Sequence, residues 1–152
     1  MINLKIAIGA DHGGFELKES IKKHLEEIGD YEICDYGTYS PESVDYAAIA
    51  YKVGTAVTEE KILGILCCGT GIGISIAANK VKGVRAACCS DYFSAKLTRQ
   101  HNDANILCMG GRVVGPGLAN ELVDIFLTTE FEGGGRHQRR IDQIAAIENG
   151  EF

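Results

Sequence analysis

The sequence predicts an α/β fold in which a five-stranded parallel sheet is covered by helices on both faces. Short apolar runs alternate with segments that carry apolar residues at helical spacing, and most of the runs end in glycine or a small polar turn. Strands and helices that alternate in this way favour parallel pairing through right-handed crossovers. One domain is expected for residues 1–152, because a chain of 152 residues with 45% hydrophobic content suffices for one real core.

The first half of the chain contains two strand–helix units. A strand at 4–9 precedes a helix at 15–28, which Gly29 ends and whose inner stripe consists of Leu17, Ile21, Leu25 and Ile28. A second strand at 31–36 precedes a helix at about 45–59, whose expected inward residues are Tyr46, Ile49, Val53 and Val57.

The second half repeats the alternation three times and then departs from it. Strands are predicted at 62–68, 84–89 and 105–109, and helices at 74–80, at 95–101 after a cap by Asp91, and after Pro116-Gly117. The inward residues of the last of these helices are Leu118, Leu122, Ile125 and Phe126. Gly133-Gly134-Gly135 then reads as a flexible hinge before a final helix that starts with the basic cluster 136–140.

The third strand ends in Cys67-Cys68-Gly69-Thr70-Gly71-Ile72-Gly73, a strand–loop–helix pattern suited to anions. Its glycines let the backbone approach a ligand, and the free N–H groups of the next helix favour negative charge. The loop lacks the Gly-x-Gly-x-x-Gly spacing and the Gly-Lys-Ser/Thr of nucleotide sites, which disfavours both readings. By itself the loop is also compatible with a packing turn, and Cys68 with a small buried residue.

Composition excludes several classes of function. A net charge of −6 argues against a general nucleic-acid binder, and no apolar stretch approaches the roughly 18 residues that span a membrane. No secretory leader precedes the first strand, so we expect a cytoplasmic protein. The six cysteines show no Cys-x-x-Cys spacing, which argues against a zinc site or a disulfide framework.

Polar residues follow the ends of the predicted strands. Asp11 and His12 follow the first strand, Thr70 the third, Asp91 the fourth and Arg112 the fifth, so all should gather at the carboxyl edge of the sheet. His101 and Asn102 end the helix before the fifth strand, and periodicity leaves open at which edge they lie. Asp11 is also compatible with a plain cap of the first helix.

Five sequence blocks stand out together: Asp11-His12-Gly13-Gly14, Cys68-Gly69-Thr70-Gly71-Ile72-Gly73-Ile74-Ser75, Arg99-Gln100-His101-Asn102-Asp103, Gly111-Arg112-Val113-Val114-Gly115 and Gly134-Gly135-Arg136-His137-Gln138. With these blocks the chain resembles the ribose-5-phosphate isomerase B family of sugar-phosphate isomerases. The resemblance implies a Rossmann-like three-layer α/β/α fold and an aldose–ketose isomerase that needs no cofactor and no metal. It also implies a homodimer or tetramer with active sites at the subunit interface.

The same resemblance assigns roles to individual residues. Cys68 is the implied base that moves a proton between C1 and C2, with Thr70 beside it, and His101 opens the furanose ring. The implied sugar contacts are Asp11, His12, Gly69, Thr70, Gly71, Ile72, Gly73 and Asn102, and the implied phosphate ligands are Arg112, Arg136 and Arg140. Some family members carry their base as glutamate where this chain has Ser75, which favours Cys68 here. An additional glycine before Arg136 departs from the family pattern.

The function expected from this resemblance is the interconversion of ribose 5-phosphate and ribulose 5-phosphate in the pentose phosphate pathway. One alternative keeps the chemistry and changes the sugar to allose 6-phosphate, galactose 6-phosphate or a tetrose phosphate. A second alternative is a non-catalytic regulator that binds phosphate with the same loop and needs neither Cys68 nor His101.

Overall fold

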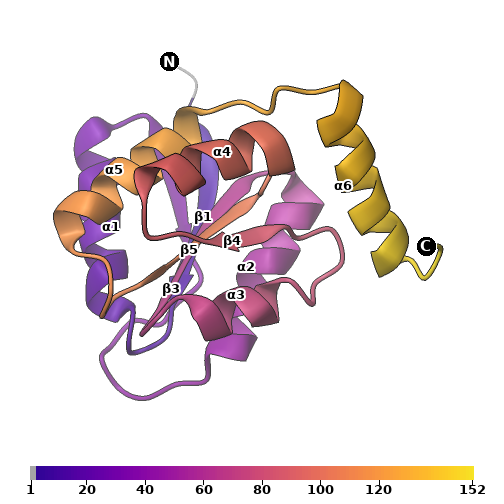
Figure 1. Cartoon of the computed structure of the whole chain (residues 1–152). Coiled ribbons are helices and arrows are strands. Elements are labelled where there is room, and N and C mark those ends of the chain that lie inside the picture. The colour runs from indigo at the N-terminus through magenta and orange to yellow at the C-terminus, as the bar shows by residue number, and fades with distance from the viewer. Residues whose placement is uncertain (1–2) are drawn as a thin grey trace.

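The computed structural model describes residues 3–152 and contains a parallel sheet between two layers of helices (Figure 1). Within these residues the strands are β1 (Leu4–Ala10), β2 (Tyr31–Asp35), β3 (Leu63–Cys68), β4 (Ala86–Cys88) and β5 (Ile106–Gly110). The helices are α1 (Phe15–Ile28), α2 (Tyr46–Glu60), α3 (Ile72–Ala78), α4 (Tyr92–Asn102), α5 (Pro116–Thr128) and α6 (Gly135–Glu148). The strand order is β2-β1-β3-β5-β4 and every pairing is parallel, so the predicted fold class is confirmed.

The sheet separates two apolar cores, and adjacent residues of β3 alternate between them. Ile65 and Cys67 pack with the buried stripes of α1, α4 and α5, whereas Leu66 and Cys68 pack with α2 and α3. This alternation follows from the two-residue side-chain period of a strand. The two adjacent cysteines therefore lie on opposite faces of the sheet, as their spacing predicted.

The strands in the middle of the sheet end at the same level. In the register of the sheet, Ala10 of β1 pairs with Cys67, and Cys68 pairs with Gly110 of β5. The loops that follow β1, β3 and β5 therefore begin side by side at the carboxyl edge. Asp11, Gly69 and Gly111 are the first residues of these loops.

Most predicted elements are found close to their expected bounds, but three side chains do not face inward as expected. Ile28, Tyr46 and Leu118 are 42%, 42% and 39% exposed. Ile28 is the last residue of α1, whereas Tyr46 and Leu118 lie in the first turns of α2 and α5. Tyr46 lies over the start of α3, where a Cβ on Gly73 would meet its ring at 2.9 Å. The predicted cap of α4 is present, because the Ser94 amide donates to Asp91 Oδ1 at 2.7 Å.

Helix α6 lies apart from the two layers, beyond the edge strand β4 (Figure 1). Gly133, Gly134 and Gly135 precede its body, and all three have positive φ. Of the apolar residues in the helix, Ile141 is buried, whereas Ile144 and Ile147 remain 49% and 61% exposed. An apolar stripe of α6 is therefore largely uncovered in the single chain.

The cysteines behave mainly as core residues. Cys67, Cys68, Cys89 and Cys108 are buried, and the six thiols are unpaired, which confirms that most are small buried hydrophobes. In residues 3–152, no helix combines the length and the apolar character needed to cross a bilayer.

Candidate active site

The loop between β3 and α3 brings a thiol against a backbone amide. The Gly71 N–H donates to Cys68 Sγ at 3.1 Å, and the same glycine caps α3 with φ of 81°. A Cβ at Gly71 would lie 2.7 Å from the backbone carbonyl carbon of Met109, so both the conformation and the space require glycine. The turn thus directs the Gly71 N–H group to the Cys68 sulfur.

The neighbouring thiols differ from Cys68 in their surroundings. Complete burial raises the pKa of Cys67 and of Cys108 well above the usual range of a thiol. Burial likewise raises the pKa of Cys89 to about 11. These three cysteines therefore stay protonated near neutral pH, which leaves them as packing residues.

The loop after β1 lies against the same edge. Asp11 Oδ1 accepts hydrogen bonds from the amides of Gly13 and Gly14 at 2.8 and 3.2 Å, so this buried carboxylate closes the turn before α1. The N-cap of α1 is Gly14 and has no side-chain hydrogen bond, so Asp11 stabilises the turn before the helix and does not cap the helix itself. His12 is exposed, and its Nδ1 accepts the Val44 N–H at 3.2 Å, which places the proton of a neutral ring on Nε2.

Thr70 and Arg112 complete the carboxyl edge. Thr70 is exposed, and its Oγ1 accepts the Ile72 amide at 3.3 Å. The Arg112 N–H donates to Gly69 O at 3.0 Å, and a Cβ on Gly69 would meet the Arg112 guanidinium at 2.9 Å. The structure thus gathers the residues predicted after β1, β3 and β5 around Cys68.

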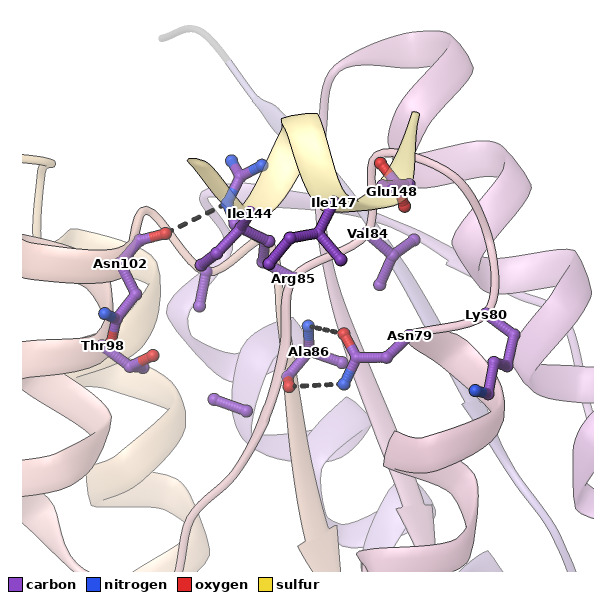
Figure 2. Close-up of a pocket in the computed structure, with 12 residues that line it drawn as sticks. Asn79, Lys80, Val84, Arg85, Ala86, Thr98, Asn102, Ile144, Ile147 and Glu148 are labelled. Carbon is purple, nitrogen blue, oxygen red and sulfur yellow. Dashed lines mark hydrogen bonds between the residues drawn. The ribbon is translucent and has the colours of Figure 1, made fainter. Parts of the chain in front are cut away.

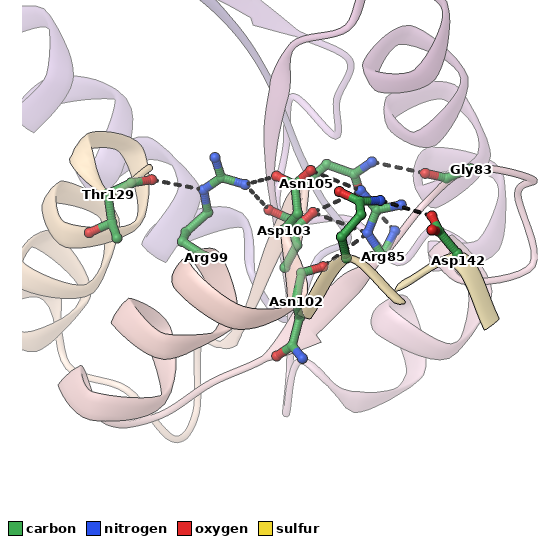
Figure 3. A network of polar contacts seen from close by, with 10 residues as sticks. Gly83, Arg85, Arg99, Asn102, Asp103, Asn105, Thr129 and Asp142 are labelled. Carbon is green, nitrogen blue, oxygen red and sulfur yellow. Dashed lines mark hydrogen bonds and ion pairs between the residues drawn. The ribbon is translucent and has the colours of Figure 1, made fainter. Parts of the chain in front are cut away.

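His101 and Asn102 lie at the opposite edge of the sheet. They end α4 just before the amino end of β5, where Arg85 Nε donates to the carbonyl oxygens of Asn102 and Asp103 at 3.0 and 3.1 Å (Figure 3). From there β5 runs through Gly110, the residue paired with Cys68. Four strand steps cover about 13 Å, so one chain does not bring His101 to its own Cys68.

A second cluster surrounds His101. Its ring stacks on that of His137 with centroids 4.2 Å apart and planes 8° from parallel. Glu132 Oε2 lies 4.0 Å from His101 Nε2 and 3.6 Å from His137 Nε2. Desolvation lowers the pKa of His137, and the neighbouring His101 and Arg136 lower it further. Neither Glu132 nor His137 was predicted from the sequence, although His137 lies within the fifth conspicuous sequence block and Glu132 directly precedes the glycines.

In residues 3–152, His101, Glu132 and His137 form the one group of potential metal ligands, with ligand atoms within 4.8 Å of one another. Both Nε2 atoms lie within 4.0 Å of the same Glu132 oxygen, and the two rings are stacked nearly parallel, so in the single chain the group is an imidazole–carboxylate cluster.

Arg136 and Arg140 are both exposed on the first turns of α6, one helical turn apart as predicted. A hollow of about 650 Å³ lies nearby between α6 and β4, with Asn102, Ile144 and Ile147 among its lining residues (Figure 2). On its floor, the Asn79 amide group pairs with both backbone groups of Ala86 at 2.8 and 3.0 Å. This hollow, like the arginines, belongs to the amino side of the sheet and not to the Cys68 edge.

Comparison with known proteins identifies the family. The model of the Ribose/Galactose Isomerase family matches residues 6–144. Ribose-5-phosphate isomerase B of Escherichia coli is 54% identical over 145 residues, covering 95% of this chain and 96% of that protein. The structure of Clostridium thermocellum ribose-5-phosphate isomerase B superposes with a TM-score of 0.93 at 51% identity, covering 98% of this chain and all of that one.

A third relative was solved with a sugar phosphate. Ribose-5-phosphate isomerase B of Mycoplasma genitalium, with bound ribulose-5-phosphate, gives a TM-score of 0.91 at 42% identity and covers 98% of this chain and 99% of that one. These matches extend over nearly the whole chain and confirm the resemblance that the five sequence blocks indicated. The Rossmann-like α/β/α arrangement is confirmed by the same structures. The chain belongs to the ribose/galactose isomerase family.

Proposed function

We propose that residues 1–152 form one isomerase domain that interconverts ribose 5-phosphate and ribulose 5-phosphate. The observation that carries the proposal is the Cys68 sulfur, placed at the last position of β3 and hydrogen-bonded to the Gly71 amide. The names of the relatives support this substrate, and so does the ribulose-5-phosphate bound in the M. genitalium protein.

The chemistry follows from what the loop offers. The Cys68 thiolate removes the C2 proton of the open-chain aldose, and the C–H electron pair forms the C1–C2 double bond of an enediolate while the carbonyl electrons move to O1. The proton then returns at C1, and the hydroxyl proton moves between O2 and O1. Backbone N–H groups of the glycine turn stabilise the oxyanion. The step is an internal redox exchange with no net electron transfer, so we propose that neither a metal nor a redox cofactor takes part.

We propose that the complete site is shared between two copies of the chain in a homodimer or a tetramer of such dimers. Cys68, Thr70, Asp11, His12 and Arg112 would come from one copy, and His101, Asn102, Arg136 and Arg140 from its neighbour. The separation of the two groups by the length of β5 supports this arrangement. So do the uncovered apolar side chains at the amino side, which include Ile144 and Ile147 of α6.

Substrate binding divides between the two groups. We propose that the Gly69–Gly73 loop, Asp11, His12 and Asn102 contact the sugar and that Arg112, Arg136 and Arg140 bind the phosphate. Arg136 and Arg140 lie one helical turn apart on the exposed side of α6, so their two guanidinium groups can bind one phosphate dianion together. The imidazole of His101 would exchange a proton with the ring oxygen when the furanose opens. We also propose that the protein acts in the cytoplasm, in the pentose phosphate pathway. The unpaired cysteines support a reducing compartment.

The test is a coupled isomerase assay in excess chelator with ribose 5-phosphate, allose 6-phosphate, galactose 6-phosphate and erythrose 4-phosphate in parallel. Ribose 5-phosphate should give the highest kcat/KM. A higher kcat/KM on another sugar would keep the proposed chemistry but change the proposed substrate. Galactose 6-phosphate is the second candidate, because the family description names galactose. Phosphate binding without turnover on any sugar would favour a regulator, and activity lost in chelator would contradict a metal-free mechanism.

A further inference from the structure

Lys18 of α1 is a charged side chain with no exposure to solvent and no part in the proposed chemistry. Burial of an ammonium group is costly unless ionic and hydrogen-bonding partners surround it. Helical periodicity also placed Lys18 on the inner side, because it lies three residues before the buried Ile21. Its partners therefore indicate why a charge is kept there.

The Lys18 ammonium joins the end of β2 to the segment that follows it. Nζ donates to Asp35 Oδ1 and Oδ2 at 2.9 and 2.8 Å and also to the carbonyl oxygen of Thr38. It lies 5.3 Å from the centroid of the Tyr39 ring, whose hydroxyl donates to Asp35 O at 2.9 Å. Burial alone would raise the pKa of Asp35, but the hydrogen bonds from Lys18 and Lys22 lower it, so Asp35 is a carboxylate at neutral pH.

The segment 36–45 that Lys18 holds runs along the carboxyl edge. The Ala10 amide donates to Gly37 O, and the Thr38 amide donates back to Ala10 O, immediately before the Asp11 turn. Further along, the Val44 N–H donates to His12 Nδ1 at 3.2 Å. The backbone of segment 36–45 therefore connects the point held by the buried ammonium, at Thr38, to the amide that contacts the imidazole, at Val44.

We propose that Lys18 is a positioning residue for His12. Its ammonium fixes segment 36–45 on the end of β1, and the Val44 amide then keeps the ring in one tautomer, with Nε2 as its N–H donor for the sugar phosphate. The kinetic consequence of this inference depends on the proposed isomerase function, whereas its structural consequence does not.

Lys22 supplies a matched control. Its Nζ lies 2.8 Å from the same Asp35 Oδ2, but the contacts of its side chain in the described residues reach only Asp35 and Glu19 and no atom of segment 36–45. When Lys18 is replaced by methionine, Asp35 keeps Lys22 and the Gly37 amide at 2.8 Å, so no carboxylate is left without a partner. Lys18→Met therefore removes the contact to segment 36–45, whereas Lys22→Met keeps it.

The first measurement is NMR of ¹⁵N-labelled protein. Lys18→Met should speed hydrogen exchange of the Thr38 and Val44 amides by about tenfold or more, because their segment opens locally. The His12 Nδ1 and Nε2 signals should move toward each other as the ring samples both tautomers. Lys22→Met should leave the exchange rates within about twofold of wild type.

The second measurement is steady-state kinetics on ribose 5-phosphate. Lys18→Met should raise KM by roughly three- to tenfold with kcat nearly unchanged, because the Cys68 loop keeps its own contacts. Lys18→Arg, which keeps the charge, should recover part of the loss, and Lys22→Met should match wild type.

Unchanged His12 signals and unchanged Val44 exchange in Lys18→Met would overturn the inference, and so would equal effects in Lys22→Met. If Lys18→Met does not fold, Asp35→Asn provides the same readouts, since it keeps the side-chain volume and weakens the grip on Lys18. A wild-type protein without isomerase activity would refute the proposed function alone, because the NMR comparison still decides whether Lys18 positions His12.

Discussion

The proposed sharing of one site between two chains predicts that inactive variants complement each other. Cys68→Ala removes the base from the carboxyl edge, and His101→Ala removes the imidazole from the amino edge. Each homodimer should be nearly inactive on ribose 5-phosphate. After subunit exchange at equal concentration, half of the dimers are mixed, and each mixed dimer contains one site in which both residues are present.

The expected recovery follows from the roughly 13 Å that separate the two groups along β5. Because a chain cannot complete its own site across that distance, the mixture should regain about a quarter of wild-type activity. Coupled assays before and after exchange measure this recovery, and native mass spectrometry confirms that mixed dimers are present.

A double variant provides the control. When Cys68→Ala/His101→Ala in one chain is mixed with wild type, every mixed dimer pairs an intact residue with a missing one, so activity should fall to about a quarter. Sites within single chains would instead leave about half of the activity in this control and no recovery in the first mixture. That pair of results would refute the shared site.

Three further predictions test individual residues. Cys68→Ala should slow exchange of the substrate C2 proton with heavy water by roughly 10²–10⁴-fold, as expected for loss of a general base. Cys67→Ala, on the other face of the sheet, should keep the exchange rate. Similar rates in the two variants would show that Cys68 is not the base. His101→Ala should lose about 10²-fold on ribose 5-phosphate but only a few-fold on erythrose 4-phosphate, which is too short to close a furanose, and equal losses would contradict a ring-opening role. Asp35 has a lowered pKa in the folded state, so the stability that it contributes is present above the ordinary value of 3.8 and is lost as pH falls through the lower folded pKa. In Asp35→Asn, the unfolding free energy measured by denaturant titration should therefore fall less steeply at acid pH than in wild type. An unchanged pH dependence would contradict this role of Asp35.

Much of the fold could be predicted because its signals are local. The stripe of Leu17, Ile21 and Leu25 defines α1, and the strand period separates Cys67 from Cys68. The placement of Asp11, Thr70 and Arg112 also followed from sequence, because parallel strands end at one edge. The side chains that were wrongly expected to face inward, Ile28, Tyr46 and Leu118, lie in the last or first turn of their helix, where the helix extends past the sheet.

The rest depends on contacts between segments that are distant in sequence. Periodicity could not assign His101 to an edge, since that depends on how α4 returns to the start of β5. The partners of Lys18 lie 17 and 20 residues away on another element, so no local pattern reveals them. Glu132 meets His101 only because its own N–H donates to Gln100 O at 3.1 Å and fixes the chain before the glycines.

Two hydrogen bonds at the end of α4 fix the chain that leads into α6, although this helix lies apart from the two helical layers. Arg99 Nε donates to Thr129 O at 3.1 Å, so the chain is attached to the end of α4 twice, here and at Glu132, before three glycines with positive φ redirect it. The helix then leaves Ile144 and Ile147 about half exposed, so complete burial would contribute roughly 1–1.5 kcal/mol each. A half-exposed apolar stripe presented after a fixed turn therefore supports the proposal that a second copy of the chain covers this side of the molecule.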